Sequence, residues 1–207
     1  MVAIPDFIPE NRLQVFQEEA EKCLATAQRV HIPQHKRGET ISYQTLRNSA
    51  PQIVAFYQSG ETSRAVSEKL RVRVMPTPVR DQSSCSILIY NQEGDHIGWH
   101  HDYNFYNGRH FTALLPLINQ AEGGADLSSS RLMIRTNGRE QEIPTPPNTL
   151  VMFEGVHVCH RVTPLGEHER RVILSMTFCT DCGTTPLKDL ERRIKDTAYF
   201  GLRALRT

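Results

Sequence analysis

The run from Arg170 to Phe178 reads RRVILSMTF, and its residue composition indicates the fold class. β-Branched and other apolar residues dominate it, which is typical of a buried strand. Four further runs are similarly rich in apolar residues: CSILIY at 85–90, HFTALLPLI at 110–118, RLMIR at 131–135 and TLVMF at 149–153. Asn-Gly, Gly-Gly and Pro-Pro turns separate them, so the pattern predicts a β-sandwich or barrel over residues 84–180.

Helical patterns flank this region, and the first 80 residues read as mostly helical support. Residues 11–30 predict one helix, because apolar residues recur at helical spacing: Leu13, Phe16, Ala20 and Leu24. Two shorter helices are expected over 49–57 and 62–71. Without an internal repeat or a low-complexity linker, residues 1–207 are expected to form a single domain.

A closing amphipathic helix is expected over residues 186–205. Leu187, Leu190 and Ile194 recur there at helical spacing among mixed charges. This apolar face would pack either on the sheet or on a second copy of the chain, so a homodimer is one candidate assembly.

Composition limits the classes of partner. A formal net charge of +1 gives no electrostatic footprint for nucleic acid or for an anionic membrane surface. The chain has no long apolar run, and its start, MVAIPDFIPENR, lacks a signal-peptide pattern, so a cytoplasmic protein is expected. Its five cysteines suit a reducing compartment. Cys179 and Cys182 have CxxC spacing without a second pair, so two ordinary thiols are expected rather than a zinc ribbon.

Candidate metal ligands occur in two separated segments. GWHHDYN at 98–104 holds His100 and Asp102, and EGVHVCHRVTP at 154–164 holds His157 and His160. Two histidines and one carboxylate from distant strands would form a facial triad, which suits Fe(II) and leaves positions for a co-substrate and O2. His101 is an alternative to His100, although period-two alternation favours His100 as the partner of Asp102. His157 and His160 both remain candidates.

A dicarboxylic keto acid would need a cationic anchor, and Arg170-Arg171 opens the last strand. The guanidinium group is planar and stays charged, so it can bind both carboxylate oxygens. Alternation places Arg171 on one face with Ser175 and Thr177, and Arg170 on the apolar face. This favours Arg171, although one bulge would reverse the assignment.

The order of these motifs resembles the Fe(II)- and 2-oxoglutarate-dependent dioxygenase family over about residues 87–180. The elements that carry the resemblance are IYNQEGDHIGWHHD, GRHFTALLPLIN, the Gly123-Gly124 pair leading into RLMI, NTLVMFEG, HRVTPL and RRVILSMTF. The resemblance implies a mainly β fold with flanking α: a double-stranded β-helix (jelly-roll, cupin-like) core with supporting N-terminal helices.

The resemblance also implies roles for individual residues. His100, Asp102 and His160 correspond to the iron ligands. Arg171, with Ser175 on its face, and Tyr90 correspond to contacts with 2-oxoglutarate. Where some members have a second tyrosine, this chain has Pro116, which departs from the pattern.

The implied activity is oxidation, most often hydroxylation, of a C–H bond with release of succinate and CO2. A small molecule such as an amino acid or a biosynthetic intermediate is the expected substrate. Asn104 and Arg109, in the loop after the histidine–aspartate motif, are candidate substrate contacts. A peptidyl (prolyl-type) hydroxylase and a non-catalytic cupin-like module that binds zinc or nickel are the alternatives.

Overall fold

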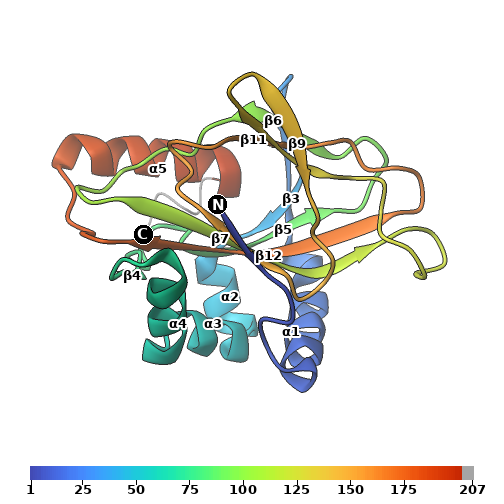
Figure 1. The fold of residues 1–207 in the computed structure, drawn as a ribbon, viewed down its shortest axis with the longest axis horizontal. Helices are drawn as coiled ribbons and strands as arrows, with labels where there is room; N and C mark the ends of the chain where they lie inside the picture. Colours follow the sequence, from blue (N-terminus) through green and yellow to red (C-terminus); the bar gives the residue numbers. More distant parts are fainter. Residues whose placement is uncertain (202–207) are drawn as a thin grey trace.

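The computed structural model describes residues 1–201, and a curled sheet with helices outside it forms the molecule (Figure 1). The helices are α1 (Glu10–Cys23), a 3-10 turn (Leu24–Thr26), α2 (Tyr43–Ser49), α3 (Pro51–Gln58), α4 (Gly60–Leu70) and α5 (Pro186–Phe200). The strands are β1 (Val2–Ile4), β2 (Gln28–Ile32), β3 (Lys36–Ile41), β4 (Met75–Pro76), β5 (Cys85–Tyr90), β6 (His96–His100), β7 (His110–Gln120), β8 (Leu132–Thr136), β9 (Arg139–Ile143), β10 (Leu150–Phe153), β11 (Cys159–Val162) and β12 (Arg170–Cys179).

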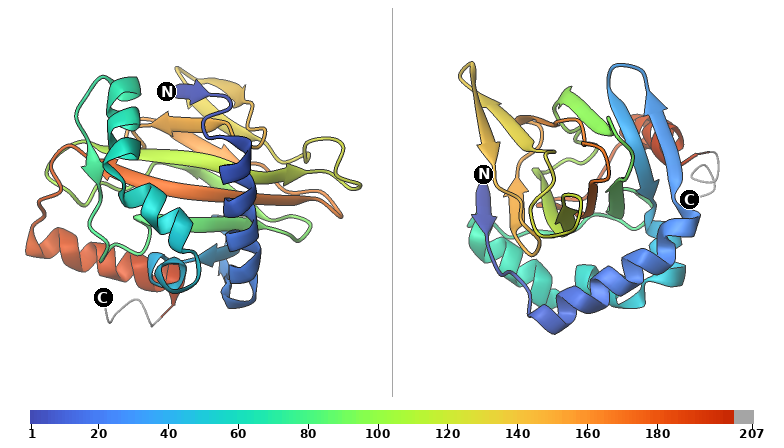
Figure 2. Two further views of the ribbon diagram at one scale, coloured as in Figure 1. Left: turned by 90° about the horizontal axis from the view of Figure 1, so that it is seen from below. Right: turned by 90° about the vertical axis from the view of Figure 1, so that its right-hand side faces the viewer.

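All these strands belong to one 12-stranded sheet with the order β1-β10-β7-β12-β5-β3-β6-β11-β8-β9. β2 pairs with β3 and β4 pairs with β12, and the pairings are antiparallel. The sheet curls into an open barrel, and α1–α4 cover one side of it (Figure 2, right). The expected mainly β, jelly-roll architecture with flanking helices is confirmed.

Alternation along β12 divides the apolar residues between two cores. Val172, Leu174 and Met176 belong to the larger core, which lies between the sheet and α1–α4. A smaller core fills the inside of the curl and includes Tyr90 and Phe153. The period of two thus sends alternate β12 side chains to the helices and to the interior of the barrel.

The expected single helix over residues 11–30 is wrong beyond Cys23. α1 ends there, and Gln28–Ile32 form β2, which pairs along its whole length with β3. β3 in turn lies between β5 and β6, so the N-terminal region supplies part of the sheet as well as helical support. Leu24 continues the helical spacing of the apolar residues in α1, but pairing of the β-branched Val30 and Ile32 with β3 determines the structure after it.

The closing helix is present as α5, but its orientation differs from the expected one. Leu187, Leu190 and Ile194 are exposed, whereas Arg192 and Asp196 are buried. Packing of the apolar face on the sheet is therefore wrong, and packing on a second copy stays a prediction. The expected residues 202–205 of this helix lie outside the described part of the chain.

Buried hydrogen bonds explain why the charged face is inside. Arg192 Nη1 donates to Asp196 Oδ2 at 2.7 Å and to the carbonyl of Arg80 at 2.8 Å. A guanidinium that is paired in this way can be buried at a tolerable cost. At 15 residues, α5 is shorter than a membrane span requires, and no other described helix has both the length and the apolar character to cross a bilayer.

Replacing Arg192 with alanine is expected to lower the free energy of unfolding by about 3 kcal/mol, because it removes the buried guanidinium that binds Asp196, Asp189 and the carbonyl of Arg80. Asp196 would keep only its contacts with Lys195 and the backbone N–H of Gln82 among the described residues. Arg193→Ala is the matched control on the same helix. Arg193 is exposed and pairs only with Asp189, so its loss is expected to cost about 0.5 kcal/mol or less. Urea unfolding measures both values, and equal losses would contradict this explanation of the orientation of α5.

Candidate active site

His100, Asp102 and His160 come together where β6 pairs with β11. Their ligand atoms all lie within 4.8 Å of one another. Asp102 Oδ1 lies 3.7 Å from Nε2 of His100 and 3.7 Å from Nε2 of His160. Two imidazole nitrogens and one carboxylate oxygen at this separation can bind one divalent ion on one face and leave its other positions open.

Strand pairing positions the two histidines. β6 and β11 are antiparallel, and His160 is the register partner of His100 across them, with an irregularity before the Val162–Ile97 pair. Asp102 is the second residue after β6, and its backbone N–H donates to the carbonyl of Gly155, at 3.0 Å, in the segment before β11. The pairing of β6 with β11 thus brings His100 and His160, 60 positions apart in the sequence, next to each other.

Backbone carbonyls fix the orientation of both imidazole rings. His100 Nδ1 lies 2.8 Å from the carbonyl of Gly98, and His160 Nδ1 lies 2.9 Å from the carbonyl of Val158. A carbonyl can only accept, so Nδ1 must carry the proton in both rings. The Nε2 lone pairs are therefore free for a metal, as in most histidine metal sites.

The Asp102 carboxylate is held by contacts that sequence reasoning missed. Thr112 on β7 donates its hydroxyl proton to Asp102 Oδ2 at 2.6 Å. Gly155 lies so close that a Cβ there would overlap the same carboxylate. Alternation in HFTALLPLI could have placed Thr112 inside the barrel, but no local signal marks Gly155.

The protonation states at the triad suit a metal. Burial and the neighbouring His160 lower the pKa of His100 to about 4, so its ring is neutral at neutral pH. Burial alone would raise the pKa of Asp102, but His160, Thr112 and His100 outweigh it and hold the pKa below its usual value. The site therefore presents a carboxylate and a neutral imidazole without prior loss of a proton.

The competing histidines lie apart from this cluster. His101 is exposed next to Asp102, and His157 is exposed with its Nε2 atom 3.8 Å from Glu154. Neither belongs to the group of potential ligands found among residues 1–201. The geometry favours His100 and His160 over both.

Arg171 lies inside the barrel and is 2% exposed. Its Nη1 atom donates to the carbonyl of Ser130 and its Nη2 atom to Thr145 Oγ1, both at 2.9 Å. Burial lowers the pKa of Arg171 to about 10, so it remains charged at neutral pH. Arg170 instead points to α1, where it pairs with Glu21 at 2.6 Å.

Tyr90 is the register partner of Arg171 on the neighbouring strand β5. Burial raises the pKa of Tyr90 to about 12, so its hydroxyl is a neutral donor. The Tyr90 hydroxyl and Arg171 Nε are both buried and have no hydrogen-bond partner within the described chain. Buried donors without partners are rare in proteins, and here two of them occur on paired residues.

Ser175, Asn104 and Arg109 are the remaining expected contacts. Ser175 is buried on the same face of β12 as Arg171. Asn104 uses its side chain within its own loop, where it bonds to the backbone of Gly108 and Tyr106. Arg109 is exposed and binds Glu154 through Nε and Nη2. Substrate contact by Asn104 and Arg109 stays a prediction.

A second pair beside the triad had no signal in the sequence. His35, at the tip of the β2–β3 hairpin, bonds through Nε2 to the hydroxyl of Tyr199 on α5 at 2.9 Å. The His35 ring also packs edge-on against His100, with 5.5 Å between centroids. These residues are 164 positions apart in sequence, and only the folded chain brings them together at the metal centre.

The expectation of two separate thiols at Cys179 and Cys182 is wrong, because the structure joins them in a disulfide. Cys23, Cys85 and Cys159 are free. Spacing alone could not distinguish a bonded from an unbonded pair, since the bond depends on the turn that follows β12.

Comparison with known proteins agrees with this geometry. The sequence profile of the 2OG-Fe(II) oxygenase superfamily matches residues 85–178, which span β5 to β12. The search of curated proteins found no significant sequence match.

Solved structures share the fold at low sequence identity. A Pseudomonas putida prolyl-4-hydroxylase is 15% identical, with a TM-score of 0.61 over 88% of this chain and 92% of its own. A Trichoplax adhaerens prolyl hydroxylase, solved with a hypoxia-inducible-factor peptide, is 13% identical, with a TM-score of 0.66 over 93% and 86%.

A third similar structure is the epimerase SnoN of nogalamycin biosynthesis in complex with Fe3+, alpha ketoglutarate and nogalamycin RO. It is 11% identical, with a TM-score of 0.65 over 86% of this chain and 78% of its own. The profile match, the shared jelly roll and the His-Asp-His triad make this chain similar to the 2OG-Fe(II) oxygenase superfamily, whose members use Fe(II), 2-oxoglutarate and O2.

Proposed function

We propose that this enzyme hydroxylates a C–H bond of a small-molecule substrate, such as an amino acid or a biosynthetic intermediate. One observation carries the proposal: the three-ligand site belongs to a barrel whose interior also holds a buried, charged guanidinium with an unused donor. A site built only to hold a structural metal would need a fourth protein ligand, and it would have no use for that cation.

The residues inside the barrel fit the groups that the family uses. His100, Asp102 and His160 would hold Fe(II), because their donors match the borderline-hard character of that ion. Arg171 and Tyr90 would bind the distal carboxylate of 2-oxoglutarate through Arg171 Nε and the Tyr90 hydroxyl, which have no hydrogen-bond partner within the described chain. When bound, iron with 2-oxoglutarate and O2 supplies oxidation of a C–H bond, with release of succinate and CO2.

The protein contributes orientation and exclusion of water. Gly98 and Val158 keep the two imidazole rings turned toward the metal position, and Thr112 holds the carboxylate. Phe153 packs against His160 with 4.7 Å between ring centroids and covers it from the interior of the barrel. A dry, preorganised site of this kind limits side reactions.

A peptidyl, prolyl-type hydroxylase is the second candidate. Two structures that share the fold are prolyl hydroxylases, and one of them holds a peptide. The match to a family of enzymes and the buried Arg171 inside the barrel support turnover over a non-catalytic metal module.

Asp102→Ala is expected to reduce succinate formation from 2-oxoglutarate by more than about 100-fold, since even partners behind the ligands are worth about 10- to 100-fold. Far-ultraviolet circular dichroism should stay close to that of the wild type. His101→Ala removes the exposed neighbour and is the matched control. Unchanged succinate formation in Asp102→Ala would refute the proposed site.

Arg171→Ala is expected to raise the 2-oxoglutarate concentration needed for half-maximal succinate formation roughly 30- to 150-fold, which is the loss of about 2–3 kcal/mol from a buried charge-assisted contact. Arg170→Ala is the control, because Arg170 pairs with Glu21 outside the barrel. A larger effect in Arg170→Ala would assign the anchor to the other arginine.

Gly155→Ala is expected to weaken Fe(II) binding about 10- to 100-fold by pushing the Asp102 carboxylate out of place. Gly60→Ala is the control, since an added Cβ there meets nothing within 4 Å. Anaerobic Fe(II) titration followed by protein fluorescence compares the two variants. Equal affinities would show that the carboxylate does not depend on the space at Gly155.

A further inference from the structure

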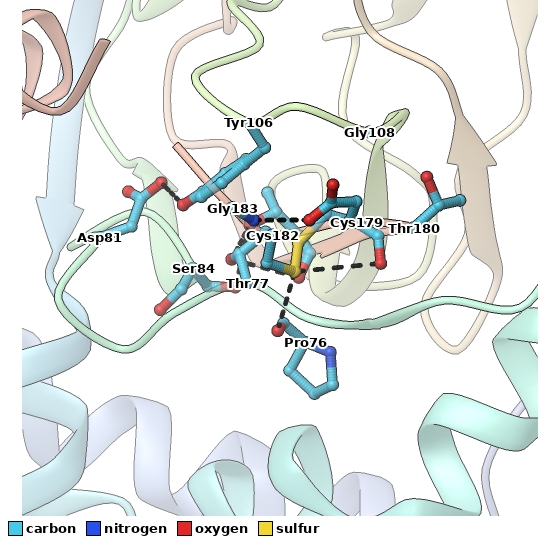
Figure 3. The surroundings of a disulfide bond; sticks show 12 residues. Pro76, Thr77, Asp81, Ser84, Tyr106, Gly108, Cys179, Thr180, Cys182 and Gly183 are labelled. Carbon is cyan, nitrogen blue, oxygen red and sulfur yellow. Dashed lines mark hydrogen bonds between the residues drawn. A yellow bond between two sulfur atoms is a disulfide. The ribbon is translucent and has the colours of Figure 1, made fainter. Parts of the chain in front are cut away.

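Figure 3 shows the surroundings of the Cys179–Cys182 disulfide, which include Tyr106 and Gly108 from the loop that follows the histidine–aspartate motif. The disulfide joins the last residue of β12 to the turn that follows, with 5.5 Å between the Cα atoms. A cross-link across so short a loop constrains the unfolded chain little, because its entropic stabilisation grows with loop length. The main consequence of this bond is therefore local: it sets the shape of the turn.

The two sulfurs differ in access. Cys179 is fully buried, whereas Cys182 is partly exposed. Thiol–disulfide exchange requires an incoming thiolate to reach one sulfur in line with the bond. Access favours attack on Cys182, with the Cys179 thiolate as the leaving group.

The bonded turn holds a neighbouring loop through its backbone. Asn107 N–H donates to the carbonyl of Gly183 at 2.8 Å, and Gly108 N–H donates to the carbonyl of Asp181 at 3.0 Å. Thr180 N–H donates in return to the carbonyl of Arg109 at 3.0 Å. These three bonds connect the disulfide turn to residues 107–109 like a short additional ladder.

Close packing makes this connection sensitive to the shape of the turn. A Cβ at Gly108 would overlap the Asp181 backbone nitrogen and Thr180 Oγ1, so the two segments have no spare room. Thr184 also donates its hydroxyl proton to the carbonyl of Phe105 at 2.6 Å. A change in the path of residues 179–184 must therefore be transmitted to residues 105–109.

The loop 103–109 has both of its ends at the metal centre. It begins directly after Asp102 and leads into β7, where Thr112 donates to the Asp102 carboxylate at 2.6 Å. Three other contacts support it: Tyr106 donates its hydroxyl proton to Asp81 at 2.8 Å, the Tyr106 carbonyl accepts from Lys188 at 2.9 Å, and Arg109 Nη2 donates to Glu154 at 2.7 Å. Order in this loop is coupled to the position of the carboxylate.

We propose that Cys179 and Cys182 form a reversible redox site that controls the order of loop 103–109 beside the metal centre. A dithiol reductant attacks the Cys182 sulfur, the bond between the two cysteines breaks, and the pair takes up two electrons and two protons. The dithiol becomes a disulfide, and exchange with such a disulfide restores the bond. Two thiols cannot remain at bonding distance, because their van der Waals radii overlap, so the turn must change shape.

Hydrogen exchange with mass spectrometry on the full chain tests the proposal without requiring iron or substrate. The protein is equilibrated with defined ratios of reduced to oxidised dithiothreitol, and free thiols are alkylated and counted. Reduction is expected to free two thiols in the 179–182 peptide, reversibly, and to remove protection from the amides of residues 103–110. The β8–β9 hairpin, which the disulfide turn does not touch, should exchange at an unchanged rate.

Two variants control the experiment. Cys182→Ser should show the faster exchange of residues 103–110 with or without reductant, whereas Cys159→Ser should respond as the wild type does. Recovery of both cysteines as thiols at every ratio would overturn the proposal. So would cleavage of the bond with no change in exchange over residues 103–110.

Discussion

The pairing of His160 with His100 across β11 and β6 is the constraint on which the site depends. A facial metal site needs donor atoms from distant parts of the chain close enough to bind one ion. The antiparallel pairing of β6 and β11 places two of these donors opposite each other. Ile97 and Val162, paired on the same two strands, belong to or pack against the inner core and fix which side chains face inward. A slip of one residue would turn both histidines away, so the inner core and the metal site define the same register.

The interior of the barrel also carries unusual polar features. Arg171 and Tyr90 lie on paired strands, and each keeps a buried donor that has no hydrogen-bond partner within the described chain. An unsatisfied buried donor costs stability, of the order of 1–3 kcal/mol. Such a cost is expected at a site that a ligand completes, and a dicarboxylate would supply both missing acceptors. The cost of these two buried donors thus agrees with binding of a dicarboxylate such as 2-oxoglutarate.

The sequence predicts the strands of the five apolar runs, the clustering of the triad and the separation of the two arginines, because each depends on a short pattern. Alternation in RRVILSMTF separates Arg171 from Arg170, and the structure places Arg170 on the helical side with Glu21. Features that depend on tertiary contacts could not be predicted. The β2–β3 hairpin, the burial of Arg192 in place of Leu190, and the Cys179–Cys182 bond all arise from packing between separated segments. His35 and Tyr199 reach the metal centre in the same way.

We propose that His100, Asp102 and His160 hold an iron ion whose coordination 2-oxoglutarate completes. Anaerobic absorbance of the wild-type protein, titrated first with Fe(II) and then with 2-oxoglutarate, measures this coordination. The visible charge-transfer band of a keto acid chelated to Fe(II) is expected, saturating at one iron per chain. Binding of iron without that band would contradict this proposal, and would mean that the barrel accepts a different co-substrate.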